Sequence, residues 1–160
     1  MIKNQRGVSL IELVTIIVVL GIAIPVLLNM WAVVAERSVR TESMAEAGLY
    51  AEELMEIIKS KSFDENATTP WSALGRDTGE SAGNSALYDD VDDFIGCTDP
   101  AITTPAAGYS RSASISYMSL TGGTWGTIAG PTDFKRIVVT VSRTDNLVNN
   151  VNLTTIVSGF

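Results

Sequence analysis

The chain opens with an uninterrupted apolar run, and this run predicts a membrane-spanning helix. No residue from Leu13 to Ala35 is charged. As an α-helix this segment would extend about 35 Å, which is enough to cross a bilayer. Gly21 and Pro25 lie inside the run, and Pro25 lacks a backbone donor, so we expect a bend or a loosened turn there. A simple kink that the surrounding packing tolerates is the alternative.

Two cations, Lys3 and Arg6, precede the apolar run and predict its orientation. The positive-inside rule places them in the cytoplasm and the chain after about Ala35 on the periplasmic or extracellular side. A secretory signal peptide is the competing interpretation, but its apolar region is normally shorter and ends in a small-residue cleavage site. Here the run continues into a second helical pattern without a clear break, which favours a single-pass anchor.

That second pattern predicts an amphipathic helix from residue 36 to residue 61. Apolar residues recur at steps of three and four along one stripe: Met44, Ala47, Ala51, Leu54 or Met55, and Ile58. The opposite face is charged, and Glu36 and Arg40 have the spacing and order of a favourable ion pair. We therefore expect one helix over residues 8 to 61, whose second half lies on a small domain.

Strand patterns appear only near the carboxyl end. Residues 64 to 108 are rich in turn-forming residues and predict an irregular connection with one or two short elements. Three runs then alternate as half-buried strands do: Ala113, Ile115 and Tyr117 among serines; Ile137, Val139 and Val141; and residues 148 to 157. Turn residues at 144 to 146 predict an antiparallel hairpin, within a three- or four-stranded meander that packs on the helix. The predicted fold class is α+β.

Composition narrows the classes of function. The formal net charge of -7 argues against a nucleic-acid partner. The chain has one cysteine, Cys97, and no histidine, which removes intrachain disulfides, histidine-containing triads and most zinc sites. We therefore expect no enzymatic activity. Burial is the expected state of Cys97, and a bridge to another chain is the alternative.

Glu12 is the residue that a plain membrane anchor does not explain. A carboxylate near the start of an apolar span is costly unless it is paired, protonated or able to reach the interface. If the chain is cut after Gly7, a new amino group appears on Val8, one helical turn before Glu12 and on nearly the same face. The alternative is that Glu12 lies in the headgroup zone of the membrane.

The segment Arg6–Val14 resembles the prepilin processing motif of type IV pilins and of the pseudopilins of type II secretion. The match combines a short basic leader, Gly7 at the cut, Glu12 as the fifth residue after it, and an uninterrupted apolar helix. The resemblance implies that prepilin peptidase cleaves between Gly7 and Val8 and that the Val8 amine is methylated. It also implies that Glu12 neutralises the amino terminus of a neighbouring subunit as helices bundle in a filament.

The resemblance further implies a pilin fold in three parts. They are a leader (1–7), a transmembrane or filament-core helix (8–35) and a periplasmic or extracellular head (36–160). The chain would lie in the inner membrane before assembly and in a surface pilus afterwards. Family members often carry a proline where this chain has Asn29, and its own proline lies earlier, at Pro25.

The lone cysteine favours a minor pilin or a pseudopilin, because major pilins commonly close a carboxyl-terminal loop with two cysteines. Segments Ala51–Asn66 and Tyr88–Phe94 are similar to minor pilins of mannose-sensitive haemagglutinin pili. The expected function is that of a minor type IV pilin, in assembly initiation, at the tip or in adhesion, with other pilin subunits and prepilin peptidase as partners. A minor pseudopilin and a membrane-anchored periplasmic binding module that does not polymerise are the alternatives.

An acidic segment of the head is a candidate metal site. Four aspartates lie close together: Asp89, Asp90, Asp92 and Asp93. Carboxylate oxygens at this density suit calcium, although the spacing does not match an EF-hand loop. The alternative is a solvated acidic loop that Val91 and Phe94 anchor to the core.

Overall fold

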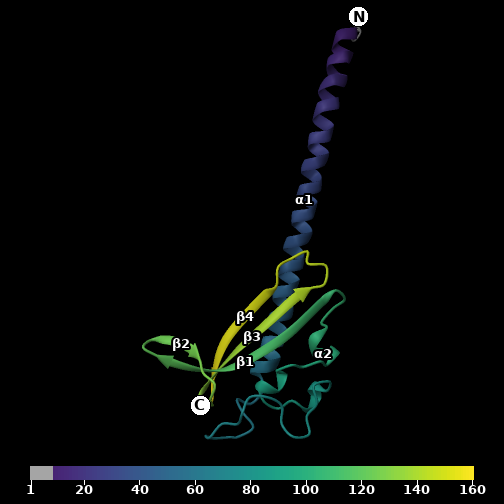
Figure 1. Ribbon diagram of the computed structural model, residues 1–160. Coiled ribbons are helices and arrows are strands. Elements are labelled where there is room, and N and C mark those ends of the chain that lie inside the picture. The colour runs from purple at the N-terminus through teal and green to yellow at the C-terminus, as the bar shows by residue number, and fades with distance from the viewer. Residues whose placement is uncertain (1–8) are drawn as a thin grey trace, which may run out of the picture. The chain divides into compact units, whose positions relative to one another are not determined.

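The computed structural model describes residues 9–160 (Figure 1), so the predicted cleavage site at Gly7 and Val8 lies outside the described residues. The elements, in chain order, are helix α1 (Leu10–Lys59), the short 3-10 helices η1 (Ser85–Leu87) and η2 (Asp92–Phe94), helix α2 (Pro100–Thr103), and strands β1 (Tyr109–Thr121), β2 (Thr124–Thr127), β3 (Phe134–Arg143) and β4 (Val151–Ser158). The chain divides into two compact units, Met1–Thr41 and Glu42–Phe160. The fold class is α+β, as the sequence predicts.

Helix α1 is continuous from Leu10 to Lys59 and includes Pro25. Gly21 and Pro25 are both helical, so the helix is not interrupted at these positions. The bend expected there stays a prediction. In the first unit, Arg40 and Glu36 form the expected pair, with 2.9 Å between the guanidinium nitrogen and the carboxylate oxygen.

The sheet is antiparallel, and its strand order is β2-β1-β3-β4. The three predicted strands, β1, β3 and β4, form an antiparallel meander in chain order, and β2, which was not predicted, adds beside β1. Strand β1 is long enough for both partners: its first part pairs with β3, with Ile115 opposite Ile137, and its end pairs with β2, with Leu120 opposite Trp125. Strand β2 escapes sequence analysis because it is short and all four of its residues are exposed.

The hairpin between β3 and β4 is confirmed. The two strands pair antiparallel, from Phe134 opposite Ser158 to Val141 opposite Val151. In the connection, Asn146 has a φ of 53°. Asparagine tolerates this left-handed conformation better than most residues, which explains its place in the turn.

One face of α1 forms the centre of the core. The side chains of Ala47, Ala51, Leu54, Met55 and Ile58 are buried, as the predicted stripe requires. Met44 is the exception, since 51 % of it is exposed, and Ser43 is buried in its place. The reason is polar contact: the hydroxyl of Tyr109 donates to the Ser43 carbonyl oxygen at 3.3 Å, and Arg143 donates to the Ser43 hydroxyl.

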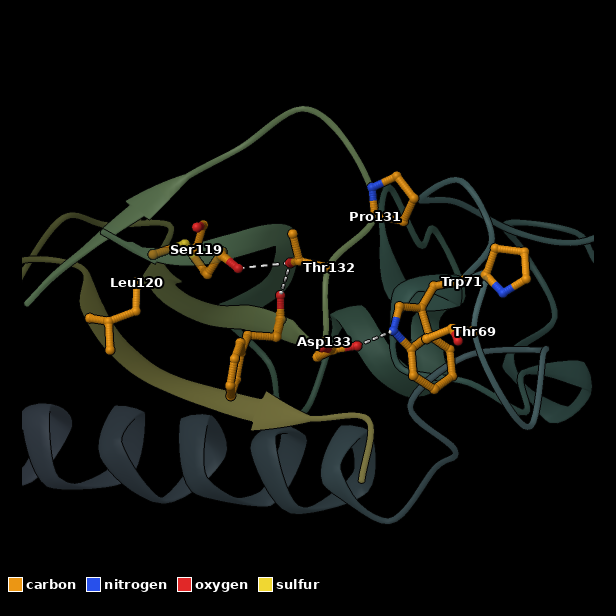
Figure 2. A pocket seen from close by; sticks show the side chains of 10 residues that line it. Thr69, Trp71, Ser119, Leu120, Pro131, Thr132 and Asp133 are labelled. Carbon is orange, nitrogen blue, oxygen red and sulfur yellow. Dashed lines mark hydrogen bonds between the residues drawn. The ribbon is translucent and has the colours of Figure 1, made fainter. Parts of the chain in front are cut away.

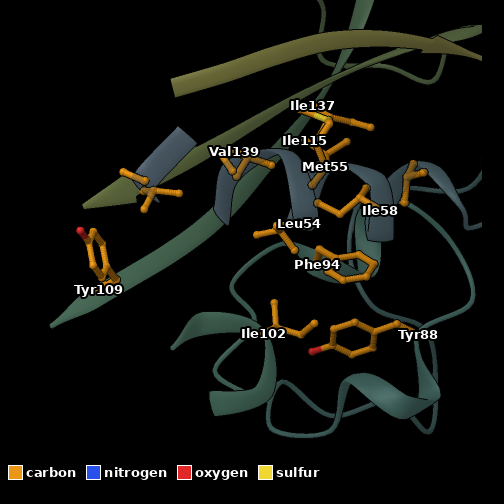
Figure 3. Close-up of a cluster of buried hydrophobic side chains, with 14 residues drawn as sticks. Leu54, Met55, Ile58, Tyr88, Phe94, Ile102, Tyr109, Ile115, Ile137 and Val139 are labelled. Atoms are coloured by element: carbon orange, nitrogen blue, oxygen red, sulfur yellow. The ribbon is translucent and has the colours of Figure 1, made fainter. Parts of the chain in front are cut away.

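The segment between α1 and β1 supplies the second side of the core. Figure 3 shows Leu54, Met55 and Ile58 of the helix between strand residues, Ile115, Ile137 and Val139, and residues of the irregular segment, Phe94, Ile102 and Tyr88. The rings of Tyr88 and Phe94 meet edge to face, with centroids 5.1 Å apart. The connection is mostly irregular, as predicted, but it contains three short elements, η1, η2 and α2, rather than one or two. It also closes the core over the helix face that the sheet leaves open.

We expect Leu54→Ala to lower the free energy of unfolding by about 2–5 kcal/mol, because it opens a cavity at a fully buried position. Met44→Ala is the control and should change it by no more than about 0.5 kcal/mol, because that side chain is half exposed. Urea unfolding of the full-length protein in detergent, followed by near-ultraviolet circular dichroism, measures both. Equal losses in the two variants would contradict this assignment of the core.

Candidate functional site

The first unit exposes apolar side chains along the helix. Between Leu10 and Val34 the large hydrophobic residues are 42–80 % exposed, and they are Leu10, Ile11, Leu13, Val14, Ile16, Ile17, Val18, Val19, Leu20, Ile22, Ile24, Val26, Leu27, Leu28, Met30, Trp31, Val33 and Val34. Neighbouring positions along the helix are equally apolar, so no polar face is left for water. By length and composition this helix can cross a membrane. Such a surface requires cover from lipid or from other helices.

Glu12 is the one charged residue between Leu10 and Ala35. It lies in the first turn of α1 and its side chain is exposed. A carboxylate in this position interacts favourably with the positive end of the helix dipole, which offsets part of its cost in an apolar setting. The predicted partner, the Val8 amine, lies outside the described residues.

In the second unit, the acidic segment is folded against the core. Asp90, Asp92 and Asp93 are buried and Asp89 is exposed. Val91 and Phe94 are buried, as the sequence predicts for the anchors of this segment. The interpretation of a solvated loop is wrong for three of the four aspartates, because burial of Val91 and Phe94 takes the adjacent aspartates inward with them.

Local backbone amides satisfy two of these buried carboxylates in part. Asp90 Oδ1 accepts from the amides of Asp92 and Asp93, at 2.9 and 3.3 Å. Asp93 Oδ2 accepts from the amides of Asp89 and Asp90, both at 3.0 Å. This reciprocal capping holds the first turn of η2 in place, as short acidic side chains do where a helical turn begins.

Asp92 belongs to a buried ionic cluster. Lys135 on β3 is fully buried, and its ammonium group donates to Asp92, to Asp64 at 3.0 Å and to the Phe63 carbonyl at 2.7 Å. The hydroxyl of Tyr117 also donates to Asp64, at 3.1 Å. Three donors meet three acceptors at the ammonium group, so the lysine charge is fully paired.

The two carboxyl groups of this cluster have different pKa shifts. Burial on its own raises the pKa of Asp64, but the hydrogen bonds from the Ser72 amide and Lys135 outweigh it and hold that pKa below its usual value. For Asp92 burial has the larger effect, and its pKa is raised despite the hydrogen bond from Lys135. Of the two carboxyl groups, Asp64 is therefore the one that ionises more readily.

Sequence analysis missed Lys135 and Asp64. Lys135 lies 71 residues from Asp64 and 43 from Asp92 in the chain, so no local spacing relates them. One signal was available: strand alternation puts Lys135 on the same face of β3 as Ile137 and Val139, and that face is buried. A lysine on a core face requires a buried anion.

A second group of carboxylates gathers beside this cluster. Three sets of side chains each bring their carboxylate oxygens within 4.8 Å of one another: Glu65, Asp77 and Asp89; Asp77, Asp90 and Asp93; and Glu80, Asp89 and Asp93. Within residues 9–160, Asp92 belongs to none of these sets. The sequence-based choice thus included three of the six residues that meet, and it lacked Glu65, Asp77 and Glu80.

The pKa values in this group reflect burial and crowding of like charges. Burial, together with contact with the Asp93 side chain, raises the pKa of Glu80 to about 7. Burial, Asp92 and Asp93 raise the pKa of Asp90 to about 7 as well. Both groups resist ionisation because nearby negative charges disfavour the charged form.

Two further features of the head are a cavity and a free cysteine. A cavity of about 510 Å³ lies between Trp71, Leu120 and Pro131, and Figure 2 shows its walls. Its one ionisable side chain, Asp133, accepts a hydrogen bond from the Trp71 indole at 2.9 Å. Cys97 is a free thiol that is half-buried and packs against the core.

Comparison with protein-family models, curated proteins and solved structures finds no significant match to this chain. The architecture itself is pilin-like, since a long apolar amino-terminal helix packs on a small antiparallel sheet.

We expect Lys135→Met to cost about 3–5 kcal/mol of stability, because it leaves Asp64 and Asp92 buried without a counter-ion. Lys59→Met is the control: its pair with Glu56 is exposed and is worth about 0–1 kcal/mol. Urea unfolding of the full-length protein measures both losses.

The triple variant that adds Asp64→Asn and Asp92→Asn to Lys135→Met should recover part of the loss, because no unpaired charge remains in it. A Lys135→Met variant as stable as Lys59→Met would show that the buried cluster does not support the fold.

Proposed function

We propose that this chain is a minor type IV pilin, which prepilin peptidase processes and which is incorporated into a surface pilus. The observation that carries the proposal is the exposed apolar surface from Leu10 to Val34, in which Glu12 is the single charge. Gly7 precedes this surface at the spacing of the prepilin motif. The pilin-like arrangement of helix and sheet in the structure supports the same proposal.

The proposed mechanism is assembly rather than catalysis. In the inner membrane, lipid covers the apolar helix, and in the filament the helices of neighbouring subunits replace the lipid. The methylated Val8 amine of one subunit meets Glu12 of another inside the bundle. Each charge lowers the cost of burying the other. A subunit in the wrong register would therefore bury both charges without a partner.

Gly7→Leu should block removal of residues 1–7, because the peptidase is expected to require a glycine at the cut. Mass spectrometry of the membrane-extracted protein should then find the full precursor, whereas the wild type should begin at a methylated Val8. Gly21→Ala is the control, since an added Cβ there meets nothing within 4 Å, and it should be processed normally. A wild-type protein that retains Met1 would overturn the proposal.

Glu12→Gln should be processed and membrane-bound but should enter filaments at least tenfold less than the wild type. The loss follows because the neighbouring amine is left buried without a partner, at a cost of about 3–5 kcal/mol. Glu36→Gln, which removes one carboxylate from an exposed pair, should assemble normally. Immunoblots of sheared pili compare the variants, and recovery instead in a periplasmic secretion pseudopilus would assign the chain to the pseudopilins.

A further inference from the structure

Five of the six carboxylates that meet in the head come from two separate segments of the chain, and the sixth is Glu65. Asp77 and Glu80 come from a turn that the Glu80 amide closes by donating to the Asp77 carbonyl at 3.2 Å. Asp89, Asp90 and Asp93 come from the segment that leads into η2. All three sets of carboxylates bridge these two segments, and Asp93 belongs to two of the three.

Asp93 also carries an orphan oxygen. Its side chain is fully buried, and Oδ1 has no hydrogen-bond partner, whereas Oδ2 accepts from two backbone amides. A buried carboxylate oxygen without a partner is costly, and native proteins rarely keep one without a bound ion or water. The unpartnered oxygen therefore points to a ligand.

The nearby cationic side chains already have other hydrogen-bond partners. Arg76 donates to the backbone carbonyls of Asp93 and Ile95, and Lys61 donates to the Tyr88 carbonyl. Lys135 is fully occupied by the buried cluster that includes Asp92. Among the salt bridges of residues 9–160, none includes any of the five converging carboxylates.

We propose that the head binds a calcium ion through Asp77, Asp90 and Asp93, with Glu80 and Asp89 completing the outer side of the site. This inference goes beyond the proposed function and does not depend on it. Two oxygens that each lie about 2.4 Å from one ion are at most about 4.8 Å apart, and the carboxylate oxygens of each set meet this limit.

The donor set selects the class of metal. All donors are oxygens and the chain has no histidine, so zinc and copper lack their preferred ligands. Calcium accepts six to eight oxygens in a flexible geometry, whereas magnesium requires a compact octahedron. Irregularly placed carboxylates from a turn and a short 3-10 helix suit calcium better. The ion would link the turn that carries Asp77 and Glu80 to the segment that leads into η2, which packs against the core.

The test uses full-length protein in detergent, stripped with a chelator and then titrated with calcium, magnesium or potassium chloride at constant ionic strength. Calcium should raise the melting temperature by about 5 °C or more at saturation, and potassium should not. Isothermal titration calorimetry should find one site per chain. An unchanged melting temperature in calcium, or an equal rise in potassium, would overturn the site, and an equal rise in magnesium would overturn the selectivity.

Asp77→Asn is the decisive variant, because Asp77 is only half-buried and forms no salt bridge within the described residues. Without calcium it should melt at or above the wild-type temperature, since one repelling charge is gone. It should also lose at least tenfold in calcium affinity. Glu52→Gln, an exposed carboxylate on α1 away from the site, is the matched control and should respond as the wild type does. A wild-type response in Asp77→Asn would overturn the assignment of ligands.

Discussion

The structure of the head depends on one packing interaction, the burial of a single face of α1 between Glu42 and Lys59. Small residues, Ala47 and Ala51, occupy one part of this face, and larger ones, Leu54 and Ile58, occupy the part nearer the helix end. The sheet covers the face from one side and the irregular segment from the other. Because both layers rest on the same stripe, the position of η2 relative to β3 is fixed, and with it the meeting of Asp92 and Lys135.

Periodicity alone predicted most of this framework. The stripe of α1, the alternation in β1 and β3 and the turn before β4 are local patterns, and each is confirmed. Met44 was assigned wrongly because steps of three and four fit Met44 and Ser43 equally well, and hydrophobicity favours the methionine. The choice is made by Tyr109 and Arg143, which bind Ser43 from distant strands. The place of β2 was also out of reach, since its four exposed residues carry no alternating pattern and its partner is only the end of β1.

The acidic segment shows the same division between local and distant information. Its apolar anchors, Val91 and Phe94, could be read from the sequence, but their depth could not, and depth decides whether the adjacent aspartates are solvated. Once these anchors are buried, each aspartate requires a partner. Asp92 finds Lys135, which comes from the middle of the sheet. The sequence shows how many carboxylates this region has. Only the fold shows which of them pair with a cation and which lie among other carboxylates.

The same electrostatic rule then connects the two ends of the chain. A carboxylate out of water needs a cation, a proton or hydrogen-bond donors, and the head supplies a cation in Lys135 for Asp64 and Asp92. Glu12 and Asp93 have no such cation within the described residues. In the proposed assembly and metal site, the counter-charge comes from outside that part of the chain: an amine on a neighbouring subunit suits a carboxylate on an apolar helix, and a metal ion suits an oxygen enclosed by other carboxylates. Both proposals thus start from a carboxylate that has no cationic partner among the described residues.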